Sequence, residues 1–204
     1  MLNNIFSHLL NQHHVSEHTI KILWDEVAEK HKEPHRHYHN FSHLGHLLSL
    51  LNEVEKLTES PQALYLAVFY HDIIYDPKAR DNEEQSAHLA KERLKDIKLP
   101  TTFIQKCTST ILATKSHLLH EDKDINYFTD ADLGILGSEW PEYVTYSQKI
   151  RKEYSCYPDK TYVEGRKKVL VHFLNMPRIY KTDYFFNKFE KRCRINLSKE
   201  LNNL

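Results

Sequence analysis

The chain has 204 residues, enough for one domain that buries a sizeable core without disulfides or a structural metal. Lysine and arginine number 28, as do aspartate and glutamate, so the formal charge is zero and there is no global basic field for a nucleic acid or an anionic membrane. Four glycines are too few for most all-β or glycine-loop nucleotide folds. Composition therefore favours helices and argues against nucleic-acid polymers and membranes as partners.

The three cysteines, Cys107, Cys156 and Cys193, are odd in number and form no CxxC pair, which argues against a disulfide framework or a thiolate zinc site. The longest apolar stretch lies within Ala63–Tyr70, far short of the ~20 residues that cross a bilayer. The first residues lack the basic region, apolar run and cleavage site of a signal peptide. We therefore expect a cytoplasmic protein. The unusual number is fifteen histidines.

Helical periodicity begins near the N-terminus. A first helix is predicted after a possible N-cap at Ser16, with Ile20, Leu23 and Val27 on its apolar face. A second is predicted after Asn40, and its apolar face carries a histidine, His43. Six of the fifteen histidines fall between residues 31 and 46. An exposed or adventitious metal-binding surface with no assigned role is expected for His13, His14, His18, His31, His35 and His37.

Sequence signals in the middle of the chain predict three further helices. Ser60 followed by Pro61 is a typical helix start, and the segment ALYLAVFYHDIIY behind it is apolar on every side, as expected of a central buried helix. Asp81 with Glu84 resembles a capping box that opens the next helix. Another starts at Pro100 and ends near residue 117, before a charged loop, HLLHEDKD.

The C-terminal third predicts a short element around DADLGILG, a helix after Pro141, another over Tyr162–Leu174 and a last one over residues 186–197. The total is about nine helices with no convincing strand pair. No repeat, low-complexity tract or linker marks a boundary. The prediction is an all-α helical bundle forming a single domain over residues 1–204, with its core at about 20–200.

Several potential metal ligands fall on apolar segments. The pair His71-Asp72 lies near the end of the central apolar helix, where ionisable groups are costly unless something pairs with them. His43 lies one helix upstream, and Asp130 and Asp132 lie in the apolar stretch FTDADLGIL. Two imidazoles with carboxylates suit a divalent ion such as Mn, Co, Ni, Fe, Zn or Mg and leave positions open for water and substrate. A buried hydrogen-bonded network without metal is the alternative.

Together these segments resemble the HD-domain metal-dependent phosphohydrolases, whose pattern is a His, then His-Asp, then a later Asp. The match is closer to a branch of predicted bacterial HD-superfamily phosphohydrolases and covers roughly residues 20–200. The resembling stretches are RHYHNFSH (36–43), FYHDIIYD (69–76), DNEEQSA (81–87), ATKSH (113–117), FTDADLGILG (128–137) and IRKEY (150–154), with YVEGRKKVLVHFL (162–174) behind them.

The resemblance implies an all-α fold and metal-dependent hydrolysis of a phosphate ester or anhydride, with a nucleotide or related small molecule as the expected substrate. The metal ligands carried over by position are His43, His71, Asp72 and Asp132. Asp130 remains an alternative to Asp132 as ligand or as a hydrogen-bond acceptor behind it. Many two-metal members carry two more histidines between the pair and the final Asp, and here one histidine lies in a matching stretch, which favours a single metal.

The family pattern identifies the catalytic base and the phosphate-binding residues less clearly than the metal ligands. Some HD nucleotidases carry a Glu three residues after the pair, where this chain has Tyr75, so Glu83 is our substitute as the catalytic base, with Asp72 as the other candidate. First-turn acids such as Glu83 are also favoured simply by the helix dipole. The expected substrate-binding residues are Arg36, Asn82, Lys115 and His117.

Two other functions remain open from the sequence. One is a non-catalytic sensor module that binds metal and a nucleotide, because the usual glutamate after the pair is missing. The other is a di-iron oxygenase, since some relatives of the HD fold use two irons. The expected partner is a small phosphorylated molecule, and the sequence leaves a homo-oligomer possible.

Overall fold

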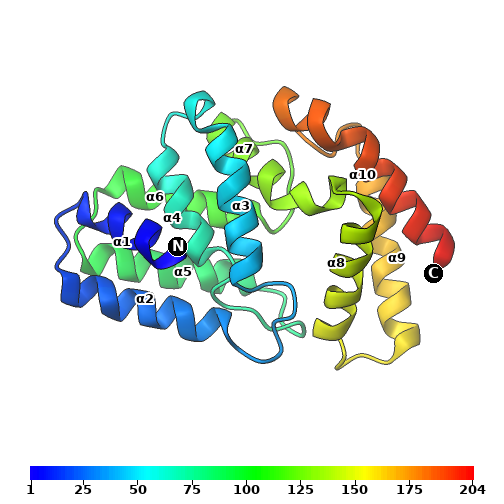
Figure 1. The fold of residues 1–204 in the computed structure, drawn as a ribbon, viewed down its shortest axis with the longest axis horizontal. Coiled ribbons are helices and arrows are strands. Elements are labelled where there is room, and N and C mark those ends of the chain that lie inside the picture. The colour runs from blue at the N-terminus through cyan, green and yellow to red at the C-terminus, as the bar shows by residue number, and fades with distance from the viewer.

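The computed structural model describes all 204 residues and is all-helical, with no strand (Figure 1). Ten α-helices and two short 3₁₀ helices make up the chain, close to the number predicted. The elements are α1 (Leu2–Asn11), α2 (Glu17–His31), α3 (Phe41–Glu53), η1 (Glu55–Leu57), α4 (Pro61–Tyr70), α5 (Asn82–Asp96), α6 (Thr101–Ala113), α7 (Lys123–Asp132), η2 (Leu133–Gly137), α8 (Trp140–Glu153), α9 (Asp159–Asn175) and α10 (Asp183–Asn203).

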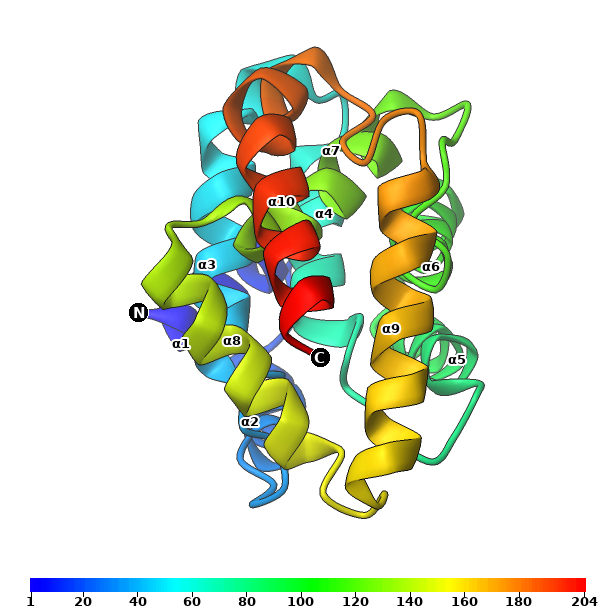
Figure 2. The ribbon, with the colours of Figure 1, turned by 90° about the vertical axis from the view of Figure 1, so that its right-hand side faces the viewer.

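The helices form two groups. Helices α1 to α7 form one body, in which α5 packs on α6 and α4 packs on α6 and α3, while α8, α9 and α10 lie to its side (Figure 1). Helix α10 packs on η2 and on α9. Seen from that side, α9 stands apart from α8, with α10 in the region between them (Figure 2). The all-α prediction is therefore confirmed.

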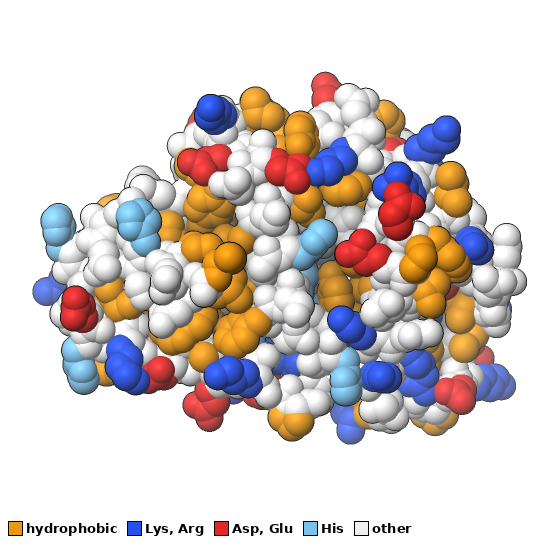
Figure 3. Space-filling model, in the orientation of Figure 1, with side chains coloured by type: hydrophobic (Ala, Val, Ile, Leu, Met, Phe, Trp, Pro, Cys, Tyr) orange, Lys and Arg blue, Asp and Glu red, His pale blue; other side chains and the backbone are white.

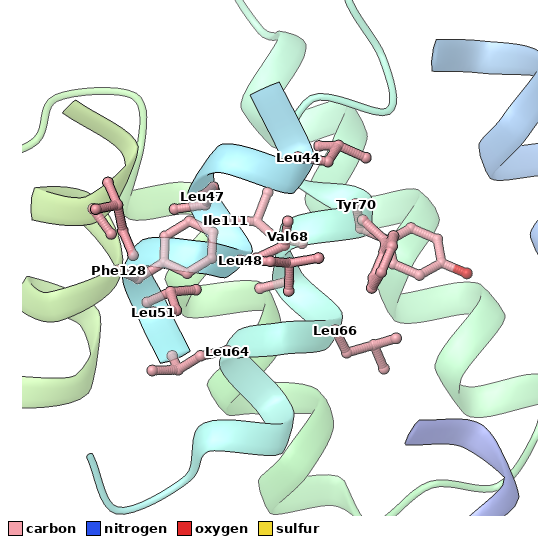
Figure 4. Packing of buried hydrophobic residues seen from close by; sticks show 14 of the residues in the cluster. Leu44, Leu47, Leu48, Leu51, Leu64, Leu66, Val68, Tyr70, Ile111 and Phe128 are labelled. Carbon is pink, nitrogen blue, oxygen red and sulfur yellow. The ribbon is translucent and has the colours of Figure 1, made fainter. Parts of the chain in front are cut away.

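The buried core is centred on α3 and α4. A cluster of 40 buried apolar residues includes Leu44, Leu47 and Leu51 from α3, which lie beside α4 and Phe128 (Figure 4). Seven of the ten residues of α4 are buried, as its apolar sequence predicted. The helix ends at Tyr70, earlier than the apolar run suggested, so His71 is its C-cap and the dipeptide His71-Asp72 begins a turn.

Two predicted N-caps are confirmed in detail, and the helix predicted after Asp81 is present as α5 but without its predicted capping box. The Ser16 hydroxyl accepts a hydrogen bond from the amide of Thr19, and the Asn40 side chain accepts one from the amide of Ser42. The capping box at residues 81–84 does not form. Asp81 makes no side-chain cap. Glu84 instead pairs with a lysine of the α6–α7 connection, which withdraws it from the helix start.

Helix α1 was not predicted, and of helix α7 only the end was covered, by the short element predicted around DADLGILG. The residues of α7 from Asp124 to Ala131 are all buried although several are polar, so its polar side chains do not mark a solvent-exposed face. Helix α7 leads directly into η2, on which α10 rests. A Cβ atom added at Gly137 would lie 2.6 Å from Cβ of Phe189, which explains why η2 needs glycine there. This close packing fixes the last residue of α7, Asp132, relative to the core.

The surface carries both signs of charge. Lysine, arginine, aspartate and glutamate side chains are interspersed over the face shown in Figure 3. No helix combines the length and the apolar composition required to cross a membrane. One histidine expected to be exposed, His31, is buried, and its Nδ1 lies 2.9 Å from the carbonyl oxygen of Val27.

Candidate metal centre

Three helices bring four potential ligands together. His43 lies in the first turn of α3, His71 and Asp72 at the C-terminal end of α4, and Asp132 at the last position of α7. His43 and His71 are buried, while Asp72 and Asp132 are partly open to a cavity. Residues 89 positions apart therefore meet because α3, α4 and α7 pack against one another.

The ligand atoms face one another at short distances. Nε2 of His43 lies 3.0 Å from Nε2 of His71 and 3.2 Å from Oδ1 of Asp132. Oδ2 of Asp72 lies 2.9 Å from Nε2 of His71. Atoms that share one ion at about 2.1 Å are separated by about 3.0 to 3.4 Å, which these spacings match. The group His43, His71 and Asp132 can hold a metal ion.

The hydrogen bonds around His71 and Asp132 suit this use, whereas Nδ1 of His43 is buried without a partner. Nδ1 of His71 lies 2.9 Å from the carbonyl oxygen of Val68, so Nδ1 carries a proton and donates it there. In the neutral ring this leaves a lone pair on Nε2, directed into the site. Behind Asp132, Nε2 of His117 lies 2.9 Å from Oδ2, the oxygen turned away from His43. Such outer contacts are typical of metal ligands.

The charges of the centre also favour a cation. Burial would lower the pKa of His71, but the carboxylates of Asp72 and then Asp132 raise it to about 9. Burial would raise the pKa of Asp132, yet hydrogen bonds from His117 and His43 and the charge of His71 hold it well below its usual range. At neutral pH both carboxylates are therefore ionised, and without a metal the protonated His71 supplies positive charge. A divalent ion would displace the Nε2 proton of His71 and supply that charge instead.

The choice between the two aspartates of α7 follows from their contacts. Asp130 is fully buried and accepts hydrogen bonds from the amides of Lys181 and Thr182 and from the Thr182 hydroxyl. It therefore anchors the segment before α10. Residues two positions apart on a helix point in different directions, which is why Asp132 faces the histidines and Asp130 does not.

Arg36 lies beside the centre but does not line the cavity. Its buried guanidinium donates to the carbonyl oxygens of Asp72 and Ile73, at 2.5 and 3.0 Å, and to the carboxylate of Glu33 at 2.9 Å. This corrects the expectation that Arg36 binds substrate. Its donors are committed to the backbone that follows α4, and they hold the His71-Asp72 turn in place.

The other predicted substrate-binding and catalytic residues do line the cavity. Glu83 lies on its wall and forms no ion pair. Asn82 also lies there, but its amide group both accepts from the amide of Asp76 and donates to the carbonyl of that residue. Lys115 is at the wall and is paired with Glu84. His117 contacts Asp132, as described above.

Sequence reasoning missed a buried carboxylate, Glu153, at the end of α8. It accepts hydrogen bonds from the amides of Tyr38 and His39, from Nδ1 of His39 at 2.7 Å and from the hydroxyl of Tyr75 at 2.9 Å. His39 lines the cavity next to Asp72. The stretch IRKEY, which ends one residue after Glu153, was a signal that could have located it.

The cavity has a volume of about 700 Å³ and lies between the centre and helices α8 and α9. It admits a small organic molecule. Comparisons of the chain with protein-family models, with curated proteins and with solved structures return no significant match. The identity of the site therefore rests on its residues and their geometry.

Proposed function

We propose that the protein is a metal-dependent phosphohydrolase of the HD type that cleaves a phosphate ester or anhydride of a small molecule. The observation that supports this most is the convergence of His43, His71, Asp72 and Asp132 at the edge of a cavity. The order His, His-Asp, Asp along the chain is the pattern of that family. A cavity at an incompletely enclosed ligand set suits catalysis better than a structural metal.

In this proposal the two histidines and the two aspartates hold one divalent ion. When bound, such an ion supplies a Lewis acid for the phosphoryl group and acidifies a water molecule. His71 contributes Nε2 because its other nitrogen donates to Val68. Asp132 contributes Oδ1, since His117 occupies Oδ2. His117 therefore orients a ligand, and its cavity position also allows it to donate to a phosphate oxygen.

Glu83 is the proposed proton acceptor. The attacking water forms a bond to phosphorus, the bond from phosphorus to the leaving oxygen breaks, and the proton of the water passes to a carboxylate. Glu83 lines the cavity without an ion pair, whereas the Asp72 oxygen is engaged with His71. Glu153 is a poor base because four donors surround it and its pKa is lowered to about 2.

The test is phosphate release from a panel of nucleotides and simple phosphate esters in the presence of Mn, Co, Ni, Zn or Mg ions. We expect His71→Ala and Asp72→Ala to lower activity by at least about a hundredfold. Replacing a residue that hydrogen-bonds to a metal ligand typically lowers activity by about 10- to 100-fold, and removing the ligand itself should cost at least as much. His88→Ala, an exposed histidine on α5, is the matched control and keeps wild-type activity.

Other outcomes would decide between the alternatives. Turnover retained in both ligand variants would refute the assignment. Stabilisation by a nucleotide with no hydrolysis under any metal would support the sensor function. An iron content near two per chain together with oxygen consumption would support the oxygenase.

A further inference from the structure

The cavity has two chemically different ends. The end at the metal centre is polar, with His43, Asp72 and Asp132. A second part of the wall, formed by α8, α9 and the turn between them, is rich in aromatic and apolar residues. We call Tyr154, Tyr157 and Tyr162 the tyrosine wall, since the ring of Tyr154 lies 6.2 Å from that of Tyr157 and 6.1 Å from that of Tyr162. This wall is suited to an aromatic group.

Helix α9 presents one face to the cavity. Tyr162, Gly165, Val169 and Phe173 follow one another at spacings of three and four residues and all line it. Val169 is 44% exposed although it is apolar, because it faces this open space. A Cβ atom added at Gly165 would meet nothing within 4 Å. Glycine in a helix interior costs about 0.5–1 kcal/mol relative to alanine, and here it leaves room for a ligand to approach the backbone.

The cations on the cavity wall are largely neutralised. Arg166 is buried and paired with both carboxylate oxygens of Glu200, at 2.8 and 2.9 Å. Lys115 is paired with Glu84. Arg80 is the lining cation without an ion pair, and the unpaired carboxylate of Glu83 lies on the same wall. A divalent ion and the Arg80 side chain are then the positive groups available to a phosphate, which suits a single phosphate group better than a polyphosphate chain.

The wall offers no free amide to a nucleobase. The one side-chain amide in the lining belongs to Asn82, and it is committed to the backbone of Asp76. The other polar groups of the lining include tyrosine and threonine hydroxyls and the side chains of Arg80 and Glu83. An apolar ring requires none of these as a hydrogen-bond partner.

We propose that the substrate is a phosphate monoester of an apolar aromatic group, whose ring lies between the tyrosine wall and the α9 backbone at Gly165. The binding of the phosphate group rests on the proposed function, because the metal centre would hold it. The recognition of the ring is inferred from the cavity wall alone. Selectivity for the ring is therefore measurable without turnover.

The experiment uses phenylphosphonate and methylphosphonate, which carry the same charge and are not hydrolysed. Calorimetry on the protein loaded with Mn²⁺ is expected to show at least about tenfold tighter binding of phenylphosphonate, since burial of the ring favours it. In Gly165→Phe the added ring fills the space, and we expect the ratio of the two affinities to fall at least about fivefold. Gly45→Phe is the matched control, because a Cβ there also meets nothing within 4 Å and Gly45 does not line the cavity.

Val169→Asp is a second variant that keeps the test decisive if Gly165→Phe does not fold. The Val169 side chain is exposed, so the substitution should not disturb the core. A charge beside the apolar ring is expected to lower the ratio of phenylphosphonate to methylphosphonate affinity. Equal affinities of the two phosphonates, no binding of either, or an unchanged ratio in both variants would overturn the proposal. Tighter binding of adenosine monophosphate or triphosphate than of phenylphosphonate would also overturn it.

Turnover is measured separately with phenyl phosphate and methyl phosphate. If the protein prefers phenylphosphonate but hydrolyses neither ester, the proposed function is refuted and the aromatic binding site is supported. Hydrolysis of both esters at equal kcat/KM would leave the function and remove the aromatic substrate.

Discussion

Glu153 shows how one residue organises the polar segment that precedes α3. Its side chain is fully buried, and it binds the backbone amides of residues 38 and 39 together with two side chains. Burial opposes its ionisation, but the hydrogen bond and charge of His39 and the two backbone amides lower its pKa to about 2. The carboxylate is therefore charged at any physiological pH and holds His39 at the cavity.

The pKa of Glu153 predicts a pH-dependent loss of stability. A carboxyl group whose pKa falls from 4.5 to about 2 on folding stabilises the fold by roughly 3 kcal/mol above pH 4.5. This contribution is lost as the pH falls from about 4.5 towards 2. Urea unfolding of wild type and Glu153→Gln between pH 3 and 7 should show a difference that shrinks across this window. A difference that does not change with pH would contradict the lowered pKa. Glu121→Gln, at an exposed position, is the control.

At the residue level, the sequence was informative about the type of the ligands and less so about their surroundings. His43, His71 and Asp132 meet as expected, because buried ionisable groups on apolar helices need partners. The choice between Asp130 and Asp132 depended on the direction of each side chain. The contacts of Arg36 could not be predicted, because its guanidinium donates to backbone carbonyl oxygens and any residue type can supply such an acceptor.

At the level of helices, most were predicted, including the buried α4, whereas the amphipathic α1 and most of α7 were not. The starts of α2 and α3 could be predicted because Ser16 and Asn40 are typical N-cap residues, and both side chains accept a capping hydrogen bond in the structure. Most of helix α7 was missed because polar side chains such as Asp124 and Asn126 indicated an exposed loop, whereas in the fold they are buried and hydrogen-bonded. The end of α4 at Tyr70 depends on the arginine that binds the following carbonyls, a tertiary contact.

Helix α9 is attached to its neighbours largely through a buried ion pair. Arg166 of α9 forms two hydrogen bonds with Glu200 of α10, and Tyr143 and Ser147 of α8 also donate to Glu200. One carboxylate therefore joins three helices, of which α8 and α9 line the cavity. Apart from Arg166, one residue of α9, Leu170, is buried.

Glu200→Ala is accordingly expected to destabilise the protein by about 3–5 kcal/mol, because it leaves a buried guanidinium without a counterion. Chemical denaturation measures the loss, and amide hydrogen exchange should rise first in α9. Asp25→Ala removes the exposed pair with Lys21, whose side chains are 58% and 73% exposed, and should cost less than about 1 kcal/mol. A loss below about 1 kcal/mol for Glu200→Ala would show that the pair does not hold α9.

At the level of the whole molecule, the metal centre and the cavity connect the two groups of helices. The candidate ligands come from α3, from the end of α4 and the turn after it, and from α7, while α8 and α9 supply another part of the cavity wall. Charges of both signs over the surface, with a net charge of zero, leave no broad field for a polymer ligand. A ligand set spread over three helices exists only in the folded chain, so an ion bound there stabilises the fold.

The most direct test of the proposed metal centre is anomalous diffraction from crystals grown with Mn²⁺. We predict one strong peak within bonding distance of Nε2 of His43, Nε2 of His71 and Oδ1 of Asp132, and its loss in His71→Ala crystals. Crystals with no peak at these atoms, or with manganese confined to surface histidines such as His14 and His18, would contradict the metal centre on which the proposed function depends.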